Sequence, residues 1–303
     1  MRPVLYYSDD YEADIGPHIF PMKKYRLVKE RLLQMGVARP EDFVEPEAAT
    51  VDDAGLVHTQ PYISKLVNGT LSAMEEARIE VPYSKELVEK SLLGAGGTIA
   101  AVASAFDRGV GVNVAGGLHH AFPDHGEGFC IFNDVAMGVA RALEDGLVVR
   151  IAIVDCDVHQ GNGTAAIFGR NEHVFTFSIH QEMNYPMVKP PSKLDIGLPN
   201  NADGALYLSN LKDGLDVIFR EFWPELVVYV AGADPYEHDL LGGLALTKQD
   251  LADRDELVMS TCVSRGVPFA VTLAGGYAER TADTADIHAA AIARAITIGE
   301  SLP

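Results

Sequence analysis

Short apolar runs alternate with segments of helical periodicity along the whole chain. Several of the runs are continuously apolar, which is typical of parallel strands covered on both faces. The predicted strands cover residues 4–7, 110–114, 151–154, 174–178, 227–230 and 269–273. The predicted helices lie near residues 21–35, 85–105, 133–143, 205–220, 247–262 and 282–298. This alternation predicts an α/β fold with a mostly parallel sheet.

Clusters of small and polar residues follow four of the predicted strands. They read "NVAGGLHH" from residue 113, "IVDCDVHQGNG" from residue 153, "YVAGAD" from residue 229 and "TLAGGY" from residue 272. Open parallel sheets bind ligands beyond the carboxyl ends of their strands, where glycines allow tight loops. We therefore expect the four clusters to converge on one site.

The second cluster has the pattern of a metal-binding face. In extended backbone, Asp155, Asp157 and His159 project to the same side, and Asp234 ends another strand. The competing interpretation is that these carboxylates cap the helix that follows from Asn162 or pair with distant bases. Two carboxylates and one imidazole with open positions indicate a catalytic site, and the absence of thiolates leaves Zn²⁺, Fe²⁺, Mn²⁺ and Co²⁺ open.

The first and fourth clusters carry groups that suit hydrolysis beside a metal. Metal-assisted cleavage of an amide needs a base, an acid and a donor for the developing oxyanion. His119, His120 and Tyr277 supply these three functions. Loop histidines are common, and Tyr277 alone could be a core aromatic residue, but the preceding Gly275 and Gly276 favour a turn that delivers its side chain to a site.

Length and composition indicate a single domain over residues 1–303. Hydrophobic residues make up 48% of the chain and charged residues 22%, which is typical of a globular protein with a sizeable core. No low-complexity linker divides the sequence. The three cysteines lack CxxC spacing, which argues against a disulfide framework and against a thiolate zinc site.

Charge and the N-terminal sequence bear on partners and location. The net charge of −19 disfavours nucleic acid and anionic membranes and attracts cationic small molecules or Lys-rich peptides, although such acidity also serves solubility alone. The chain lacks an apolar run of about 18 residues that would span a membrane. It becomes acidic at Asp9, before a secretory signal develops, so we expect a cytoplasmic protein.

Six motifs, in this order between about residue 116 and residue 277, resemble the histone deacetylase family of the arginase-deacetylase superfamily. They are "GGLHHAF", "GFCIFND", "DCDVHQGNGT", "SIH", "GAD" and "AGGY". The segment "HIFPMKKYRL" and the loop "HQEMNYPMVKPPSKLDIGLP" resemble the bacterial and class IV branch more than class I. The resemblance implies one α/β domain with a largely eight-stranded parallel sheet, and zinc-dependent hydrolysis of an N-acyl-lysine-like amide.

The resemblance also implies roles for individual residues. The zinc ligands would be Asp157, His159 and Asp234, with Fe²⁺ as the alternative metal in vivo. The residues that act on the amide would be His119 and His120 as the acid/base pair, Tyr277 as the group that polarises the acyl carbonyl, and Asp155 as the partner of His119.

A second ion and a substrate channel follow from the same resemblance. The side chain of Asp155, the backbone carbonyls of Asp157 and His159 and the hydroxyl of Ser178 match a monovalent-cation site, so K⁺ is expected. The residues expected to line a narrow acyl-lysine channel are Gly128, Phe129, Tyr185 and Leu241, although the pattern alone would place Phe129 in the core.

The sequence departs from the class I pattern at Asn162, where class I proteins carry an aspartate partner for the second histidine. His120 should therefore be less stabilised as imidazolium and better suited to act as a neutral base. The family's acid that binds the substrate backbone precedes the helix at Lys85, and Glu80 is the only candidate that we can name for it.

Several functions compete with deacetylation of an acyl-lysine peptide. Acetylpolyamine deacetylation suits the acidic chain, and the class IV resemblance permits removal of long fatty-acyl chains. An arginase-like reaction would need a second metal cluster, and residues 234–238 lack the further aspartate for one. A non-catalytic acyl-lysine reader is disfavoured because every expected catalytic position is intact. The sequence does not determine the oligomeric state.

Overall fold

Eight parallel strands form one sheet in this computed structural model, which describes residues 2–302. The strand order across the sheet is β2-β1-β3-β8-β7-β4-β5-β6. The strands are β1 (Val4–Tyr6), β2 (Phe43–Val44), β3 (Val110–Asn113), β4 (Ile151–Asp155), β5 (Val174–Gln181), β6 (Leu194–Leu198), β7 (Leu226–Val230) and β8 (Phe269–Thr272). The prediction of an α/β fold with a largely eight-stranded parallel sheet is confirmed.

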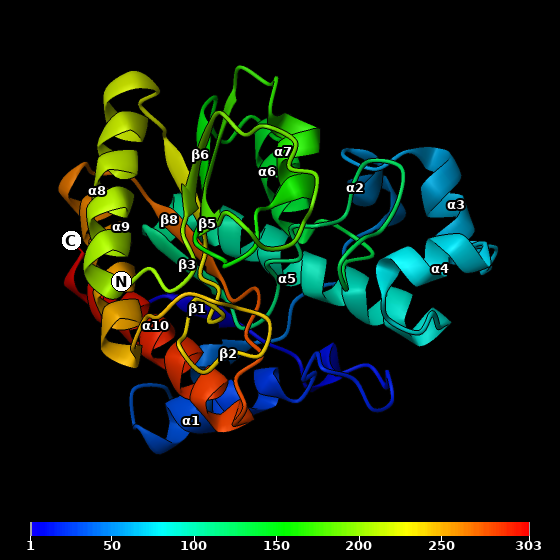
Figure 1. Cartoon of the computed structure of the whole chain (residues 1–303), viewed down its shortest axis with the longest axis horizontal. Helices are drawn as coiled ribbons and strands as arrows, with labels where there is room; N and C mark the ends of the chain where they lie inside the picture. Colours follow the sequence, from blue (N-terminus) through cyan, green and yellow to red (C-terminus); the bar gives the residue numbers. More distant parts are fainter. Residues whose placement is uncertain (1, 303) are drawn as a thin grey trace.

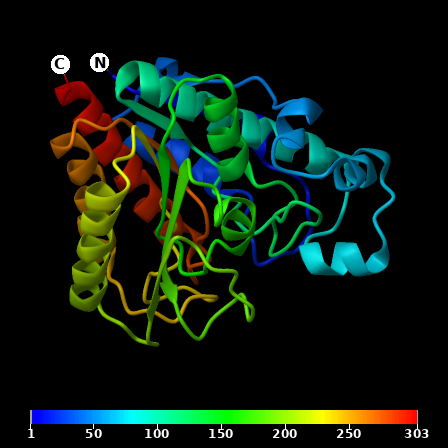
Figure 2. The ribbon, with the colours of Figure 1, turned by 90° about the horizontal axis from the view of Figure 1, so that it is seen from above.

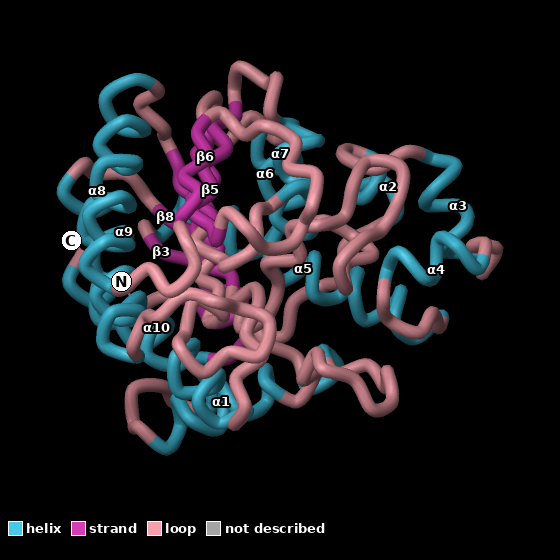
Figure 3. The backbone as a smooth tube through the Cα atoms, in the orientation of Figure 1, coloured by secondary structure: helices cyan, strands magenta, loops and turns pink. Residues whose placement is uncertain are grey.

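Helices cover both faces of this sheet (Figures 1 and 3). The helices on one face are α5 (Lys85–Arg108), α6 (Asp134–Glu144) and α7 (Asn162–Phe168). The layer on the other face contains α8 (Gly204–Glu221), α9 (Lys248–Ser264) and α10 (Thr281–Ser301), with α1 (Lys24–Gln34) packed on α10. The long helices correspond to the six predicted ones. Because both faces are covered, the central strands are continuously buried.

Three short helices form a separate group at one end of the molecule, where Figures 1 and 2 show them projecting beyond the sheet. They are α2 (Val51–Gly55), α3 (Gln60–Asn68) and α4 (Ala73–Ile79), and two short 3₁₀ helices lie at Asp9–Tyr11 and Pro40–Asp42. Local capping defines two of these helices, since Thr50 and Ser72 each form a capping box with the acid three residues later.

The segment "HQEMNYPMVKPPSKLDIGLP", which the sequence analysis describes as a loop, begins with the last two residues of β5 and also contains a strand. Its second part forms β6, which pairs in parallel with β5 at the edge of the sheet. Asp195 and Gly197 are exposed while Leu194 and Ile196 are partly buried. An edge strand covered on one face alternates polar and apolar positions, and its five residues lack the continuous apolar run of the central strands.

The sheet order decides where the polar clusters meet. Strands β3, β8, β7 and β4 are consecutive neighbours, and all four run in the same direction. Their carboxyl ends therefore lie side by side, which brings together the segments that contain His119, Asp157, Asp234 and Tyr277.

None of the helices among residues 2–302 is both long and apolar enough to cross a membrane. The predicted domain of 1–303 includes residues 1 and 303, which lie outside the described residues.

Candidate active site

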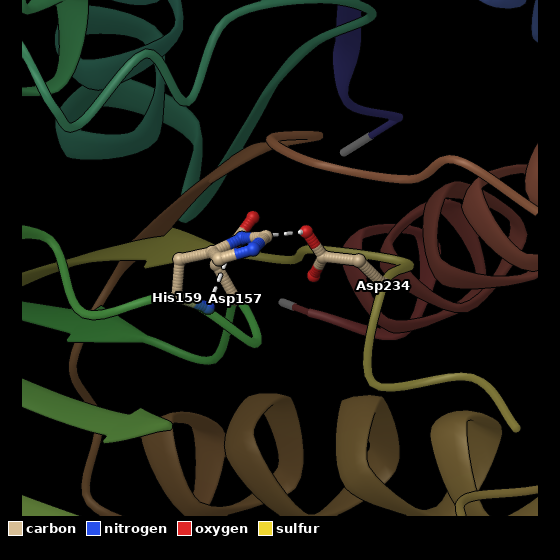
Figure 4. A group of neighbouring side chains, drawn as sticks. All are labelled: Asp157, His159 and Asp234. Carbon is tan, nitrogen blue, oxygen red and sulfur yellow. Dashed lines mark hydrogen bonds and ion pairs between the residues drawn. The ribbon is translucent and has the colours of Figure 1, made fainter. Parts of the chain in front are cut away.

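Asp157, His159 and Asp234 form a buried group at the carboxyl ends of β4 and β7. One potential ligand atom from each side chain lies within 4.8 Å of the other two. Figure 4 shows the His159 ring between the two carboxylates, with Asp157 and His159 coming from one loop and Asp234 from another. The two strands are adjacent and in register from Ile151 to Asp155, so the sheet itself sets this spacing.

Backbone amides hold both carboxylates in place. Asp157 accepts hydrogen bonds from the amides of His159 (2.9 Å) and Gly275 (2.8 Å). Asp234 Oδ1 accepts one from the amide of Val158 (2.9 Å). The other oxygen of Asp234, Oδ2, is buried and has no hydrogen-bond partner among residues 2–302, and His159 Nδ1 lies 3.4 Å away. A buried carboxylate oxygen in this state is an available metal ligand.

The electrostatics of this group also favour a cation. Burial and the nearby charge of Asp157 raise the pKa of Asp234 to about 7. Burial by itself would lower the pKa of His159. The hydrogen bonds and charges of Asp157 and Asp234 have the larger effect and raise this pKa to about 10. The pocket therefore stabilises positive charge between two carboxylates. Two oxygen donors and one imidazole nitrogen in this arrangement fit a divalent metal ion with open coordination positions.

His119 is oriented by Asp155, the last residue of β4. Its Nδ1 donates to Asp155 Oδ2 over 2.6 Å, and both side chains are buried. Burial opposes the charged ring, but Asp155 and Asp157 together raise the pKa of His119 to about 9. On its other side, His119 Nε2 lies 3.1 Å from Nε2 of His120. The resemblance-based pairing of His119 with Asp155 thus has the geometry of a hydrogen bond.

His120 has a neutral partner. Its Nδ1 lies 2.6 Å from Oδ1 of Asn162, at the start of α7. Burial and the neighbouring His119 and His159 hold the pKa of His120 well below its ordinary value. The pKa values of the two adjacent histidines are therefore shifted in opposite directions: two carboxylates raise that of His119, whereas burial and neighbouring imidazoles lower that of His120.

A carboxylate that the sequence pattern did not point to lies behind Asn162. Glu127 Oε1 accepts hydrogen bonds from Asn162 Nδ2 (2.7 Å) and from the hydroxyl of Tyr185 (2.9 Å). The one sequence feature that could have identified Glu127 is its position directly before Gly128, at the start of a mainly apolar motif.

Tyr277 lies beside the metal-binding group. Its ring centroid is 6.5 Å from that of His159 and 5.9 Å from that of Phe129. Its backbone amide donates to Asp239 Oδ2 (2.6 Å). Lys24, fully buried, donates to the carbonyl of Ala274 (2.6 Å) in the same loop. Neither Asp239 nor Lys24 could be assigned to the site from the sequence, because both reach this loop only in the folded chain.

A cavity of about 170 Å³ leads to this group. All four residues expected to form the channel line it: Gly128, Phe129, Tyr185 and Leu241. The side chains that line it beside the metal-binding group are His120, His159 and Tyr277, and the cavity is also lined by Glu80 and Asn184. Glu80 follows α4 in the left-handed conformation, with φ of 62°. The structure thus places this candidate backbone-binding acid on the cavity wall.

Ser178 lies beside Asp155 in the sheet. The two residues are register partners in β5 and β4. The hydroxyl of Ser178 is 2.9 Å from Nδ1 of His180, and both side chains are buried. Two of the residues expected at the monovalent-cation site are therefore neighbours.

The model of the histone deacetylase domain matches residues 18–293. The chain belongs to the histone deacetylase family. An uncharacterized protein of Picosynechococcus sp. is 42% identical over 286 residues, which cover 94% of this chain and 95% of the relative. Histone deacetylase 2 of Arabidopsis thaliana is 30% identical over 291 residues, which cover 91% of this chain and 75% of that protein.

The fold of the family is also found among solved structures. The crystal structure of the HDA15 HD domain superposes with a TM-score of 0.79 at 21% identity, covering 99% of this chain and 91% of that one. This likeness concerns the fold. Together with the family match, it identifies the chain as a histone deacetylase-family hydrolase with a single α/β domain.

Proposed function

We propose that this protein is a zinc-dependent hydrolase that removes an acetyl or other short acyl group from an N-acyl-lysine-like amide. The observation that carries the proposal is the position of the Asp157, His159 and Asp234 group at the cavity lined by His120 and Tyr277. These three residues would hold Zn²⁺, with Fe²⁺ as the alternative. A bound ion of this kind supplies Lewis acidity to the amide carbonyl and to the attacking water.

The two histidines have different roles in the reaction. His120 is neutral, and its Nε2 takes a proton from the attacking water and later gives one to the leaving amine. His119 keeps its charge beside Asp155 and provides electrostatic stabilisation next to the reacting atoms. A buried cation adjacent to developing negative charge is worth more than the same cation in water.

Tyr277 supplies the second donor for the carbonyl oxygen. Its ring lies beside His159, and its hydroxyl is the donor that the ring can present toward a substrate in the cavity. Charge develops on the carbonyl oxygen as the amide is attacked, so a hydrogen bond from this hydroxyl strengthens in the transition state. The loop is held in position by the hydrogen bonds of Lys24 and Asp239.

The cavity suits a linear amine with a short acyl group. Phe129 and Tyr185 supply apolar walls, while Glu80 on the wall attracts a cationic or amide-bearing substrate. An acetylpolyamine remains the second candidate substrate, because the net charge of −19 attracts free polyamines as well as Lys-rich peptides. A long fatty-acyl-lysine amide is the third candidate substrate. We also propose K⁺ beside Asp155 and Ser178, whose oxygens suit a hard cation.

One screen tests this function. Purified protein is assayed for metal content and for release of the amine from an acetyl-lysine peptide, an acetylpolyamine and a fatty-acyl-lysine peptide. We expect near-stoichiometric zinc or iron and the highest kcat/KM on the acetyl-lysine peptide. A preference for the acetylpolyamine would support the second candidate. Metal-loaded protein that cleaves none of the three amides would contradict the proposed hydrolysis.

A further inference from the structure

The side-chain amide of Asn162 lies between His120 and Glu127. Its Oδ1 is 2.6 Å from His120 Nδ1, and its Nδ2 is 2.7 Å from Glu127 Oε1. Asn162 and His120 are almost fully buried, and the side chain of Glu127 is 19% exposed. The three side chains form one hydrogen-bonded chain that ends next to the metal-binding group.

The chemistry of each group gives this chain a direction. A carboxylate only accepts hydrogen bonds, so Glu127 must face the NH₂ end of the amide. The carbonyl end of Asn162 then faces His120, and an amide oxygen also only accepts. His120 must therefore donate from Nδ1, which leaves the lone pair of the neutral ring on Nε2.

The contact with His119 fits the same tautomer. The Nε2 atoms of His119 and His120 lie 3.1 Å apart, so one hydrogen lies between them. When His119, whose Nδ1 donates to Asp155, supplies this hydrogen, His120 Nε2 is the acceptor.

The position of Glu127 is itself secured. Its Oε1 accepts a second hydrogen bond, from the hydroxyl of Tyr185, whose ring packs edge-on against His120 at 5.0 Å between centroids. Its Oε2 lies 3.5 Å from Nε2 of His125. The carboxylate is therefore held between Asn162 and the cavity wall and has little freedom to turn away from the amide.

We propose that Glu127 is a positioning residue for the reaction: through the amide of Asn162, it holds neutral His120 in the Nδ1-protonated tautomer, with Nε2 free to accept a proton. This inference rests on the proposed function, in which His120 Nε2 takes the proton of the attacking water and passes it to the leaving amine. Glu127 belongs neither to the residues that line the cavity nor to the metal-binding group, and its hydrogen bond to Asn162 connects it to His120.

The Glu127→Gln variant tests the proposal. Glutamine keeps the size of the side chain but offers both a donor and an acceptor, so the Asn162 amide is free to flip and His120 is no longer restricted to one tautomer. We expect ¹⁵N NMR of histidine-labelled, zinc-loaded protein to show only the Nδ1-protonated form of neutral His120 in the wild type and a mixture in the variant. We expect kcat to fall by roughly 10- to 100-fold with KM unchanged.

The matched control is Glu76→Gln, because Glu76 is exposed and lies in α4. It should leave both the tautomer and the rate unchanged. A rescue variant adds Asn162→Asp to Glu127→Gln: the new carboxylate accepts from His120 Nδ1 whatever residue 127 offers. This double variant should return to the single Nδ1-protonated tautomer and recover most of the lost kcat.

The measurements separate this inference from the proposed function. An Nε2-protonated His120 in the wild type would overturn the inference without any variant. A single tautomer with a wild-type rate in Glu127→Gln, or a double variant that fails to restore the tautomer, would also overturn it. Wild-type protein that shows the expected tautomer but hydrolyses no amide would refute the proposed function and leave the structural role of Glu127 intact.

Discussion

The backbone amide of Gly275 donates a 2.8 Å hydrogen bond to Oδ2 of Asp157. This bond links the loop after β8, which carries Tyr277, to the loop after β4, which carries two of the proposed metal ligands. A Cβ atom at Gly275 would overlap the carboxylates of both Asp157 and Asp234. The loop that presents the tyrosine therefore approaches the metal-binding group as closely as a backbone without a side chain permits.

Gly275→Ala should accordingly weaken metal binding. The added methyl group must displace one of the two carboxylates, so we expect less bound metal after dialysis and a loss of activity in proportion. Gly94→Ala is the matched control, because its Cβ would meet nothing within 4 Å inside α5. Alanine is favoured over glycine in a helix by roughly 0.5–1 kcal/mol, so this control should be slightly stabilised. Unchanged metal content in Gly275→Ala would contradict the close approach.

Removing either carboxylate ligand should abolish both activity and bound metal. Asp157→Ala or Asp234→Ala leaves two protein ligands, and an open site with three ligands has no redundancy. Metal analysis by mass spectrometry after purification checks this, with Asp107→Ala as a control at an exposed position. Near-stoichiometric zinc in both ligand variants would show that the metal is bound elsewhere.

His120→Ala should impair proton transfer while leaving the metal in place. We expect kcat to fall by roughly two to four orders of magnitude, the usual contribution of a positioned acid or base. Metal content should match that of the wild type, because the proposed ligands do not include His120. The exposed His173 serves for a control substitution to alanine. A wild-type rate without the His120 imidazole would remove it from the mechanism.

Asn162→Asp should change the pH dependence of the reaction. The substitution is best made in the Glu127→Gln background and compared with Glu127→Gln alone. In the wild-type background the new aspartate would face the carboxylate of Glu127, which is 2.7 Å from the Asn162 side chain. A carboxylate partner stabilises the imidazolium and raises the low pKa of His120. The base is active when neutral, so the acid limb of the kcat/KM profile should move to higher pH. An unchanged profile would show that residue 162 does not influence His120.

Tyr277→Phe should separate catalysis from binding. The ring, its contacts with Phe129 and His159, and the metal-binding group are all retained. Loss of one oxyanion donor should lower kcat by about 10²- to 10³-fold. Metal content, Tm and affinity for a zinc-chelating hydroxamate should change little, because the hydroxamate is bound mainly by the metal. Turnover of an acetyl-lysine substrate at nearly the wild-type rate would identify Tyr277 as a packing residue.

The elements of the core could be predicted from the sequence because their pattern is local. The continuous apolar run of β4 reflects cover on both faces. The extended backbone predicted for Asp155, Asp157 and His159 holds only for Asp155, because β4 ends there and the other two residues lie in the bend that follows. The edge strand β6 could not be recognised, since alternate positions along it are exposed and its periodicity resembles that of a polar loop. The hydrophobic pattern therefore predicts those strands that helices cover on both faces of the sheet.

The site was only partly determined by the sequence. Individual motifs indicated Asp157, Asp234 and Tyr277, and their resemblance to one family joined them into a single hypothesis. The position of Glu127 relative to Asn162 and the contact between Lys24 and Ala274 were decided by tertiary structure alone. These contacts join residues 35 and 250 positions apart. No local periodicity encodes such pairs, because they form only when the strand order places distant loops beside one another.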